Sequence, residues 1–143
     1  MKRSFLLFIL FLTYSMGLAG NPTSIDSLAN TINDTCPIEW EYNCVIKSVD
    51  SKVSSISIKM DYNDANGDFF TKLRENARNN REEWIYRLYM ISPEWQRLFN
   101  QCVADSTNIT LLIFSSGGAF SIKIFPAQIV DMKSTKKAQL RSL

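Results

Sequence analysis

The fold is decided by residues 68–104, which read DFFTKLRENARNNREEWIYRLYMISPEWQRLFNQCVA. The stretch holds two of the three tryptophans, and its apolar residues recur at helical spacing on both sides of Ser92-Pro93. Serine is a favoured N-cap and proline a favoured first helical residue, so a new helix is expected there. We predict one long helix from Asp68, a break at Ser92-Pro93, and a shorter helix ending near Ala104.

Strand patterns flank this helical stretch on both sides. Before it, apolar and polar residues alternate over 38–47 and again over 55–62, with a polar turn between them. After it, residues 108–115 are apolar on both sides, as in a central strand, and a last strand over 120–124 stops at Pro126. The sequence therefore predicts two antiparallel hairpins.

A short amphipathic helix between Thr23 and Asp34 is expected to precede the first hairpin. The element order is then α-β-β-α-α-β-β. The predicted fold class is α+β, with an antiparallel sheet of about four strands and the helices packed on one face as a lid.

The N-terminus has the pattern of an export leader. Lys2 and Arg3 precede the apolar run Phe5–Leu12, and Gly17-Leu18-Ala19 supplies the small residues of a cleavage site. We predict a signal peptide over 1–19, a single domain over 20–132 and a basic flexible tail over 133–143. The expected location is periplasmic or extracellular after cleavage near Ala19, with no transmembrane span in the mature form.

Charge and composition exclude several classes of function. Because Lys2 and Arg3 leave with the leader, the 16 basic residues fall to 14 and equal the 14 acidic residues. A neutral protein has no strong field to attract a polyanion, so no nucleic-acid partner is expected. The chain has no histidine, which excludes Ser-His-Asp and Cys-His catalysis and His-ligated zinc. The acidic residues 61–68 fit neither register of an EF-hand loop, and we expect no metal and no cofactor.

Three short motifs resemble small exported proteins of unknown function from Bacteroidota-type bacteria. They are Thr35-Cys36-Pro37 after the first helix, the turn Ser116-Gly117-Gly118, and Pro126-Ala127-Gln128-Ile129 after the last strand. The last motif departs from the Pro-x-Glu-Leu of that group, and the turn lacks its lysines. The resemblance implies a fold and an exported location, and it implies no activity and no site residue.

Glu39 and Glu41 are the weak catalytic candidates. On the predicted strand they lie two residues apart, which places their carboxylates on one face at roughly 6–7 Å. Such spacing is compatible with the acid and base of a glycosidase. Alternating glutamates on a strand are more commonly a solvated face, so we do not predict catalysis.

Arg74, Arg78 and Arg81 form the weak candidate for binding a partner, because they line one flank of the predicted long helix. A carboxylate-rich protein or glycan would complement them. Pairing within the helix with Glu75, Glu82 and Glu83, together with solvation of the charges, is the more common outcome, and it is what we expect.

The three cysteines, Cys36, Cys44 and Cys102, predict one disulfide and one free thiol after export. If residues 36–44 run extended, Cys36 and Cys44 are roughly 25 Å apart and cannot pair. Cys44 and Cys102 both point inward and form the favoured pair, with Cys36–Cys102 as the alternative.

These patterns favour a small exported protein that binds an unknown protein or cell-envelope component without catalysing a reaction. Two alternatives stay open. One is a hydrolase of envelope glycans that uses carboxylates such as Glu39 and Glu41. The other is a carrier whose apolar ligand lies between Trp40, Trp84, Trp95 and the sheet.

Overall fold

The computed structural model describes residues 24–64 and 69–142 and shows an α+β fold. The helices in these residues are α2 (Ile25–Asn33), α3 (Phe70–Asn79), α4 (Arg81–Tyr89), α5 (Pro93–Ala104) and α6 (Pro126–Arg141). The strands are β1 (Ile38–Glu39), β2 (Cys44–Lys52), β3 (Ser55–Tyr62), β4 (Asn108–Ser115) and β5 (Gly118–Ile124). The predicted leader (1–19) and the start of the predicted long helix at Asp68 lie outside the described residues.

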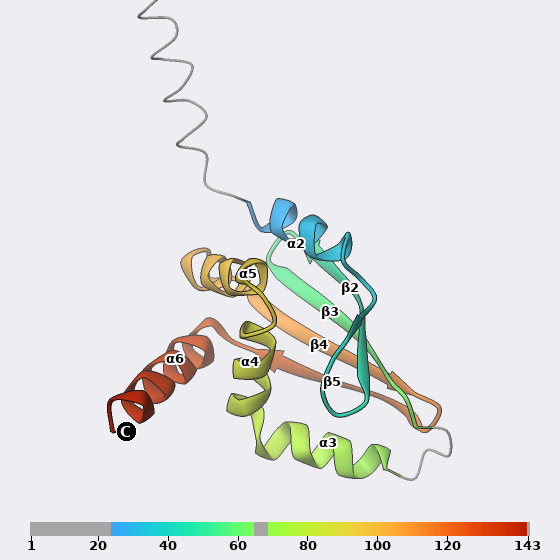
Figure 1. Ribbon diagram of the computed structural model, residues 1–143. Coiled ribbons are helices and arrows are strands. Elements are labelled where there is room, and N and C mark those ends of the chain that lie inside the picture. The colour runs from blue at the N-terminus through green and yellow to red at the C-terminus, as the bar shows by residue number, and fades with distance from the viewer. Residues whose placement is uncertain (1–23, 65–68, 143) are drawn as a thin grey trace, which may run out of the picture.

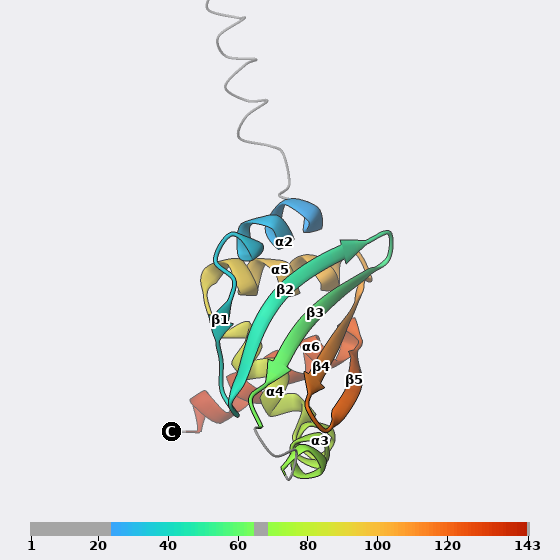
Figure 2. The same cartoon turned by 90° about the vertical axis from the view of Figure 1, so that its right-hand side faces the viewer.

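One five-stranded sheet forms the centre of the molecule, in the order β1-β2-β3-β4-β5 (Figure 2). The two predicted hairpins, β2–β3 and β4–β5, are confirmed as antiparallel pairs. The sheet is mixed, however, because β3 and β4 pair in parallel, and the prediction of a purely antiparallel four-stranded sheet is wrong. The cause is the crossover through α3, α4 and α5, which returns the chain to the end of the sheet where β3 began.

The additional strand is β1. The sequence predicts one continuous strand over 38–47, but the structure divides this segment into β1 and the start of β2. Tyr42 and Asn43 have φ values of 58° and 56°, a left-handed conformation that reverses the chain. As a result β1 folds back on β2, and Glu39 pairs with Val45. The alternating pattern contains no glycine at the reversal, so the sequence alone suggested a strand without a break.

The single long helix predicted before Ser92 is divided in the structure into α3 and α4. Asn80, with φ −115° and ψ 36°, ends α3 and precedes α4, and its side-chain amide donates to the Asn76 carbonyl at 3.2 Å. Such local side-chain bonds compete with helix continuation. The corner between α3 and α4 is visible in Figure 1 and lets both helices keep their apolar stripes on the core.

The helices cover one face of the sheet, as predicted (Figure 1). The covered face carries the alternate apolar residues of each long strand, including Ile58, Leu111 and Ile122, at 0%, 0% and 3% exposure. Both predicted core tryptophans, Trp84 and Trp95, are 1% exposed. The opposite face of the sheet is open to solvent, and Lys47 and Lys59 are exposed on it.

The C-terminal segment differs from its prediction. Helix α6 continues to Arg141, so residues 133–141 of the predicted tail are helical. The first half of α6 is anchored by Ile129 and Met132, which are 0% and 1% exposed. No helix in the described residues is both long and apolar enough to span a bilayer.

Candidate functional site

The two edges of the sheet differ in how far their backbone groups are already bonded. At one edge, β1 pairs with the start of β2. Beyond β1, the Asn33 side chain bonds the Val49 backbone in both directions, accepting from its N–H at 2.6 Å and donating to its carbonyl at 2.6 Å. An unpaired strand edge invites association with another chain, and this edge is protected by a short strand and a side chain.

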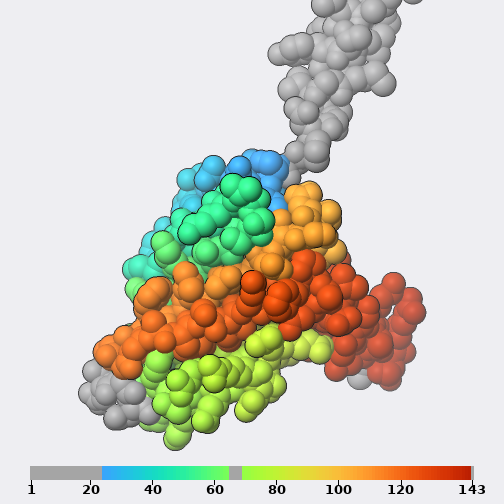
Figure 3. Space-filling model, turned by 180° about the vertical axis from the view of Figure 1, so that it is seen from behind, coloured from blue at the N-terminus to red at the C-terminus, as the bar shows by residue number. Residues whose placement is uncertain are grey.

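At the other edge, no other segment in the described part of the chain covers β5 (Figure 3). Ser115 and Gly118 face each other across the two-residue turn and close the β4–β5 hairpin. Alternation from this pair directs the backbone N–H and carbonyl groups of Ala119, Ser121 and Lys123 away from β4. Phe125, the next residue of this series, donates its N–H to Gln128 Oε1 at 2.8 Å, in agreement with that direction.

Helix α3 runs beside β5 in the same direction (Figure 1). The ring of Phe70 contacts that of Phe120 in β5 at 5.3 Å between centroids. On the opposite flank of α3, Leu73 and Asn76 line a hollow with Tyr62 of β3. Residues four apart on a helix share a face, so the flank that begins at Phe70 continues through the predicted candidates Arg74 and Arg78 along β5.

Arg81 extends this row at the start of α4. The three side chains, Arg74, Arg78 and Arg81, are termed the arginine row. Within residues 24–64 and 69–142, none of them forms an ion pair, and the Nε atoms of Arg74 and Arg81 are buried without a hydrogen-bond partner. The predicted ion pairs with Glu75, Glu82 and Glu83 are therefore not formed, whereas Arg78 is exposed to solvent as expected.

A hollow of about 290 Å³ lies at the end of β5, where α4 meets α6. It is lined by Asn79, Arg81, Glu82, Ile85, Gln128 and Asp131. Gln128 links it to the strand, because the same side chain holds the Phe125 N–H. The free edge of β5, the arginine row and this hollow together make up the β5 ledge, the candidate site.

The open face of the sheet is electrostatically different from the β5 ledge. Two of its lysines are paired across neighbouring strands: Lys59 Nζ lies 3.1 Å from Asp50 Oδ2, and Lys47 Nζ lies 3.8 Å from Asp61 Oδ2. Exposed pairs of this kind leave little unsatisfied charge for a partner. The ledge is therefore the better candidate for a charged ligand.

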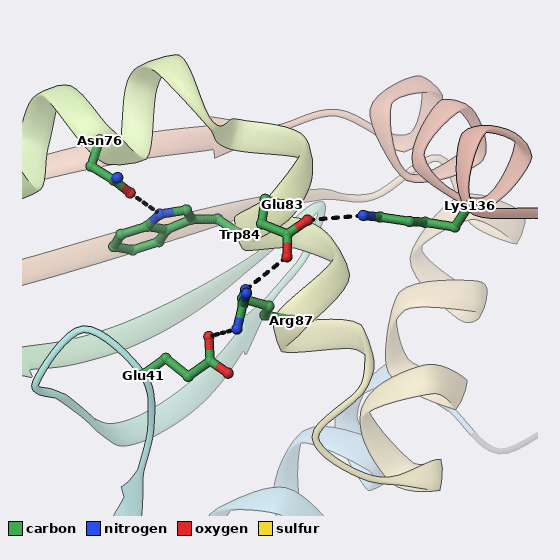
Figure 4. A network of polar contacts seen from close by, with 6 residues as sticks. All are labelled: Glu41, Asn76, Glu83, Trp84, Arg87 and Lys136. Carbon is green, nitrogen blue, oxygen red and sulfur yellow. Dashed lines mark hydrogen bonds and ion pairs between the residues drawn. The ribbon is translucent and has the colours of Figure 1, made fainter. Parts of the chain in front are cut away.

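The two weak catalytic candidates are not arranged as an acid–base pair. Glu39 is in β1, whereas Glu41 is in the loop that reverses the chain, so they do not lie on one strand face as predicted. Glu41 forms an ion pair with Arg87 of α4 (Figure 4). Its carboxylate thus holds the loop against the helix.

Arg87 belongs to a wider network. Its Nε donates to Glu83 Oε1 at 2.8 Å, and Lys136 of α6 donates to Glu83 Oε2 at 2.9 Å (Figure 4). The hydrogen bond from Lys136 is the main cause that lowers the pKa of Glu83, and Arg87 acts in the same direction. The network joins the β1–β2 loop, α4 and α6, and its role is structural.

The region between the tryptophans is filled by aromatic rings. Tyr42 stacks on Trp84 at 5.0 Å, and Trp40 meets the same indole edge-on at 5.1 Å. Trp84 Nε1 donates to Asn76 Oδ1 at 2.9 Å (Figure 4). Trp95 packs separately against Phe99. This packing provides no support for a ligand pocket between the three tryptophans.

All three cysteines are free thiols, and neither predicted disulfide is formed. Burial raises the pKa of Cys44 and of Cys102 to about 12, and it also raises that of Cys36. The extended run assumed between Cys36 and Cys44 does not exist, because the chain reverses between them. Among the described residues, no three His, Cys, Asp or Glu side chains are grouped to hold a metal ion.

Comparisons with known proteins identify a fold and no family. No protein-family model matches the chain, and no curated protein matches it. A crystal structure of a candidate secreted protein of Pseudomonas aeruginosa superposes with a TM-score of 0.54 at 7% identity, covering 73% of this chain and 88% of that one. The pilotin EpsS of the Vibrio vulnificus type 2 secretion system superposes with a TM-score of 0.52 at 17% identity, covering 73% and 87%. At these identities the likeness shows the fold alone.

The sequence indicated the arginines of the ledge and the strand beside them, but not that this strand lies at an edge of the sheet. The pattern over residues 120–124 predicts a strand, but nothing in it states that this strand lies at an edge. Ala119, Ser121 and Lys123 contribute through backbone groups, which every residue except proline possesses in full. The sequence gives one indication that this edge can accept another strand. Charged residues usually protect an edge strand from such pairing, and residues 118–124 contain a single charged residue, Lys123.

Proposed function

We propose that this chain is an exported, non-catalytic interaction protein that binds another protein of the cell envelope. The observation that carries the proposal is the β5 ledge. It combines an unprotected strand edge with three arginines that have no ion-pair partner in the described part of the chain. A free edge is costly in a protein that binds nothing because it promotes aggregation, and an arginine without an ion-pair partner can accept a carboxylate from another protein.

The leader pattern supports export. Lys2 and Arg3, the apolar run Phe5–Leu12 and the small residues before Gly20 favour cleavage near Ala19 and delivery to the periplasm or beyond. The resemblance of three motifs to small exported Bacteroidota-type proteins agrees with this location. So do the two fold neighbours, since one is described as a candidate secreted protein and the other as a component of a secretion system.

The alternatives are less well supported. A carboxylate hydrolase needs two carboxylates flanking one bond, and Glu41 is instead held by Arg87. A carrier needs a cavity, and the aromatic rings around Trp84 contact one another.

The function is tested by capture from the native envelope. The tagged mature protein is crosslinked in envelope fractions of its own organism, and the captured proteins are quantified against a tag-only control. We expect one or a few proteins enriched at near-stoichiometric amounts and retained by an Arg97→Glu variant, which changes charge on α5 away from the ledge. Repeated capture of nothing above the control would contradict an interaction protein. Turnover of envelope glycans that disappears in the Glu39→Gln, Glu41→Gln double variant would favour the hydrolase instead.

A further inference from the structure

We propose that the free edge of β5 binds an extended acidic segment of another protein, which joins the sheet as an additional strand beside the arginine row. The inference rests on the proposed function, because it specifies how the interaction protein recognises its partner. The backbone supplies the affinity of such strand addition, and side chains on alternate positions supply the specificity.

The backbone of β5 presents a regular set of bonding groups. Ala119, Ser121 and Lys123 each direct one N–H and one carbonyl away from β4, at intervals of about 6.8 Å along the strand. The seven residues of β5 are long enough to pair with an extended segment of about five to seven residues. In Figure 3 no other segment of residues 24–64 and 69–142 lies over this edge, whereas Asn33 bonds the backbone beside the opposite edge of the sheet.

The charges beside the edge indicate an acidic partner. Phe70 contacts Phe120 of β5, so helical periodicity places Arg74 and Arg78 on the flank of α3 nearer to this strand. Lys123 is exposed on the other side of the strand. Side chains of an added strand alternate between these two sides of the sheet. If its acidic residues occupy every second position, they all point either toward the arginines or toward Lys123, depending on the register of the added strand. The hollow at the end of β5 is mixed in charge, since Arg81 is joined there by Glu82 and Asp131. The acidic preference therefore belongs to the strand and not to the hollow.

A second copy of the chain is a poorer occupant. Two β5 edges paired in antiparallel fashion bring two Lys123 side chains and two arginine rows into one interface. Like charges across neighbouring strands are destabilising. An acidic segment of a different protein removes this repulsion and supplies partners for the guanidinium groups.

A synthetic peptide provides a defined probe. The probe is a terminally blocked octapeptide that alternates glutamate and valine, and its control is the same peptide with lysine in place of glutamate. We expect the purified mature protein to bind the acidic peptide and not the basic one, with affinity that falls as salt is raised. Equal binding of both peptides, or binding of neither, would overturn the inference.

Ser121→Pro is the decisive variant, because proline lacks the N–H that Ser121 directs outward and leaves the β4–β5 bonds of its neighbours intact. We expect it to weaken peptide binding about tenfold, the effect of losing one hydrogen bond and its register. Ser121→Ala keeps the N–H and should bind normally. If Ser121→Pro fails to fold by circular dichroism, Arg78→Glu serves in its place. It should weaken binding about fivefold, whereas the matched reversal Arg97→Glu should not.

Amide hydrogen exchange gives an independent readout of the binding mode. Peptide binding should protect the amides of Ala119, Ser121 and Lys123, while those of Phe120 and Ile122 are already protected by β4. Binding without this alternation would overturn strand addition, and a dimer by sedimentation without peptide would identify a second copy as the occupant. If an envelope partner still binds the Ser121→Pro variant normally, binding at the β5 edge is refuted, while the proposed interaction function stands. Capture of no partner by the wild-type chain would refute the proposed function itself.

Discussion

At the scale of single residues, the cysteines show how burial overrides composition. Three cysteines behind a predicted leader predict a disulfide, yet Cys44 and Cys102 are buried in the core as separate thiols. Burial disfavours the thiolate, which is the reactive form, and raises both pKa values to about 12. At pH 8 these two side chains are therefore neutral and unreactive.

This predicts the thiol count of the native protein. At pH 8 the native protein should react with a thiol reagent at Cys36 only, and slowly, because Cys36 is partly exposed and its pKa is also raised. After denaturation without reductant, all three thiols should react. A reduced sample is the control and should give the same count. A count of one in the denatured, unreduced sample would show that a disulfide is present.

At the scale of elements, the sheet depends on side chains that complete its backbone bonding. Asn33, near the end of α2, satisfies both backbone groups of Val49, which is 0% exposed. These bonds tie the end of the first helix to β2 at Val49, beyond the last β2 residue that pairs with β1. The first helix is thus needed to protect this edge as well as to bury its apolar stripe.

Asn33→Ala tests this role. It leaves the N–H and carbonyl of Val49 without partners, and we expect the free energy of unfolding to fall by about 1–3 kcal/mol. Urea denaturation measures the change, and hydrogen exchange at Val49 should accelerate. The control is Asn30→Ala, an exposed asparagine on the same helix. Equal stability of the two variants would show that the paired bonds to Val49 contribute nothing measurable.

At the scale of the whole molecule, an ionic network connects parts of the chain that are distant in sequence. Glu83 lies between Arg87 and Lys136, and Arg87 also binds Glu41 in the β1–β2 loop. The folded state lowers the pKa of Glu83, so its ionised form contributes stability above the unfolded value of about 4.3. That contribution is lost as the pH falls through the lower pKa of the folded state.

Glu83→Gln should therefore destabilise the protein in a pH-dependent way. Near pH 7 the free energy of unfolding should fall by about 1 kcal/mol, because the pairs are partly exposed. Near pH 3 the difference from the wild type should shrink, since the wild-type carboxyl becomes protonated there. Denaturant titrations at both pH values measure it, with Glu82→Gln as the control on the same helix. A difference that stays constant between pH 7 and pH 3 would exclude the ionised carboxylate as its cause.

The sequence by itself determined the α+β class, both hairpins, the helix that begins at Pro93 and the inward position of Trp84 and Trp95. These features depend on local periodicity and on proline, whose effects act within a few residues. The tertiary structure alone decided the reversal at Tyr42 and Asn43, the corner at Asn80 and the parallel pairing of β3 with β4. It also decided which strand lies at the free edge. Strand order depends on how the crossover packs across the sheet, and that long-range choice leaves no periodic pattern in the chain. The arginine row could be seen in the sequence, but its position beside an open strand could not.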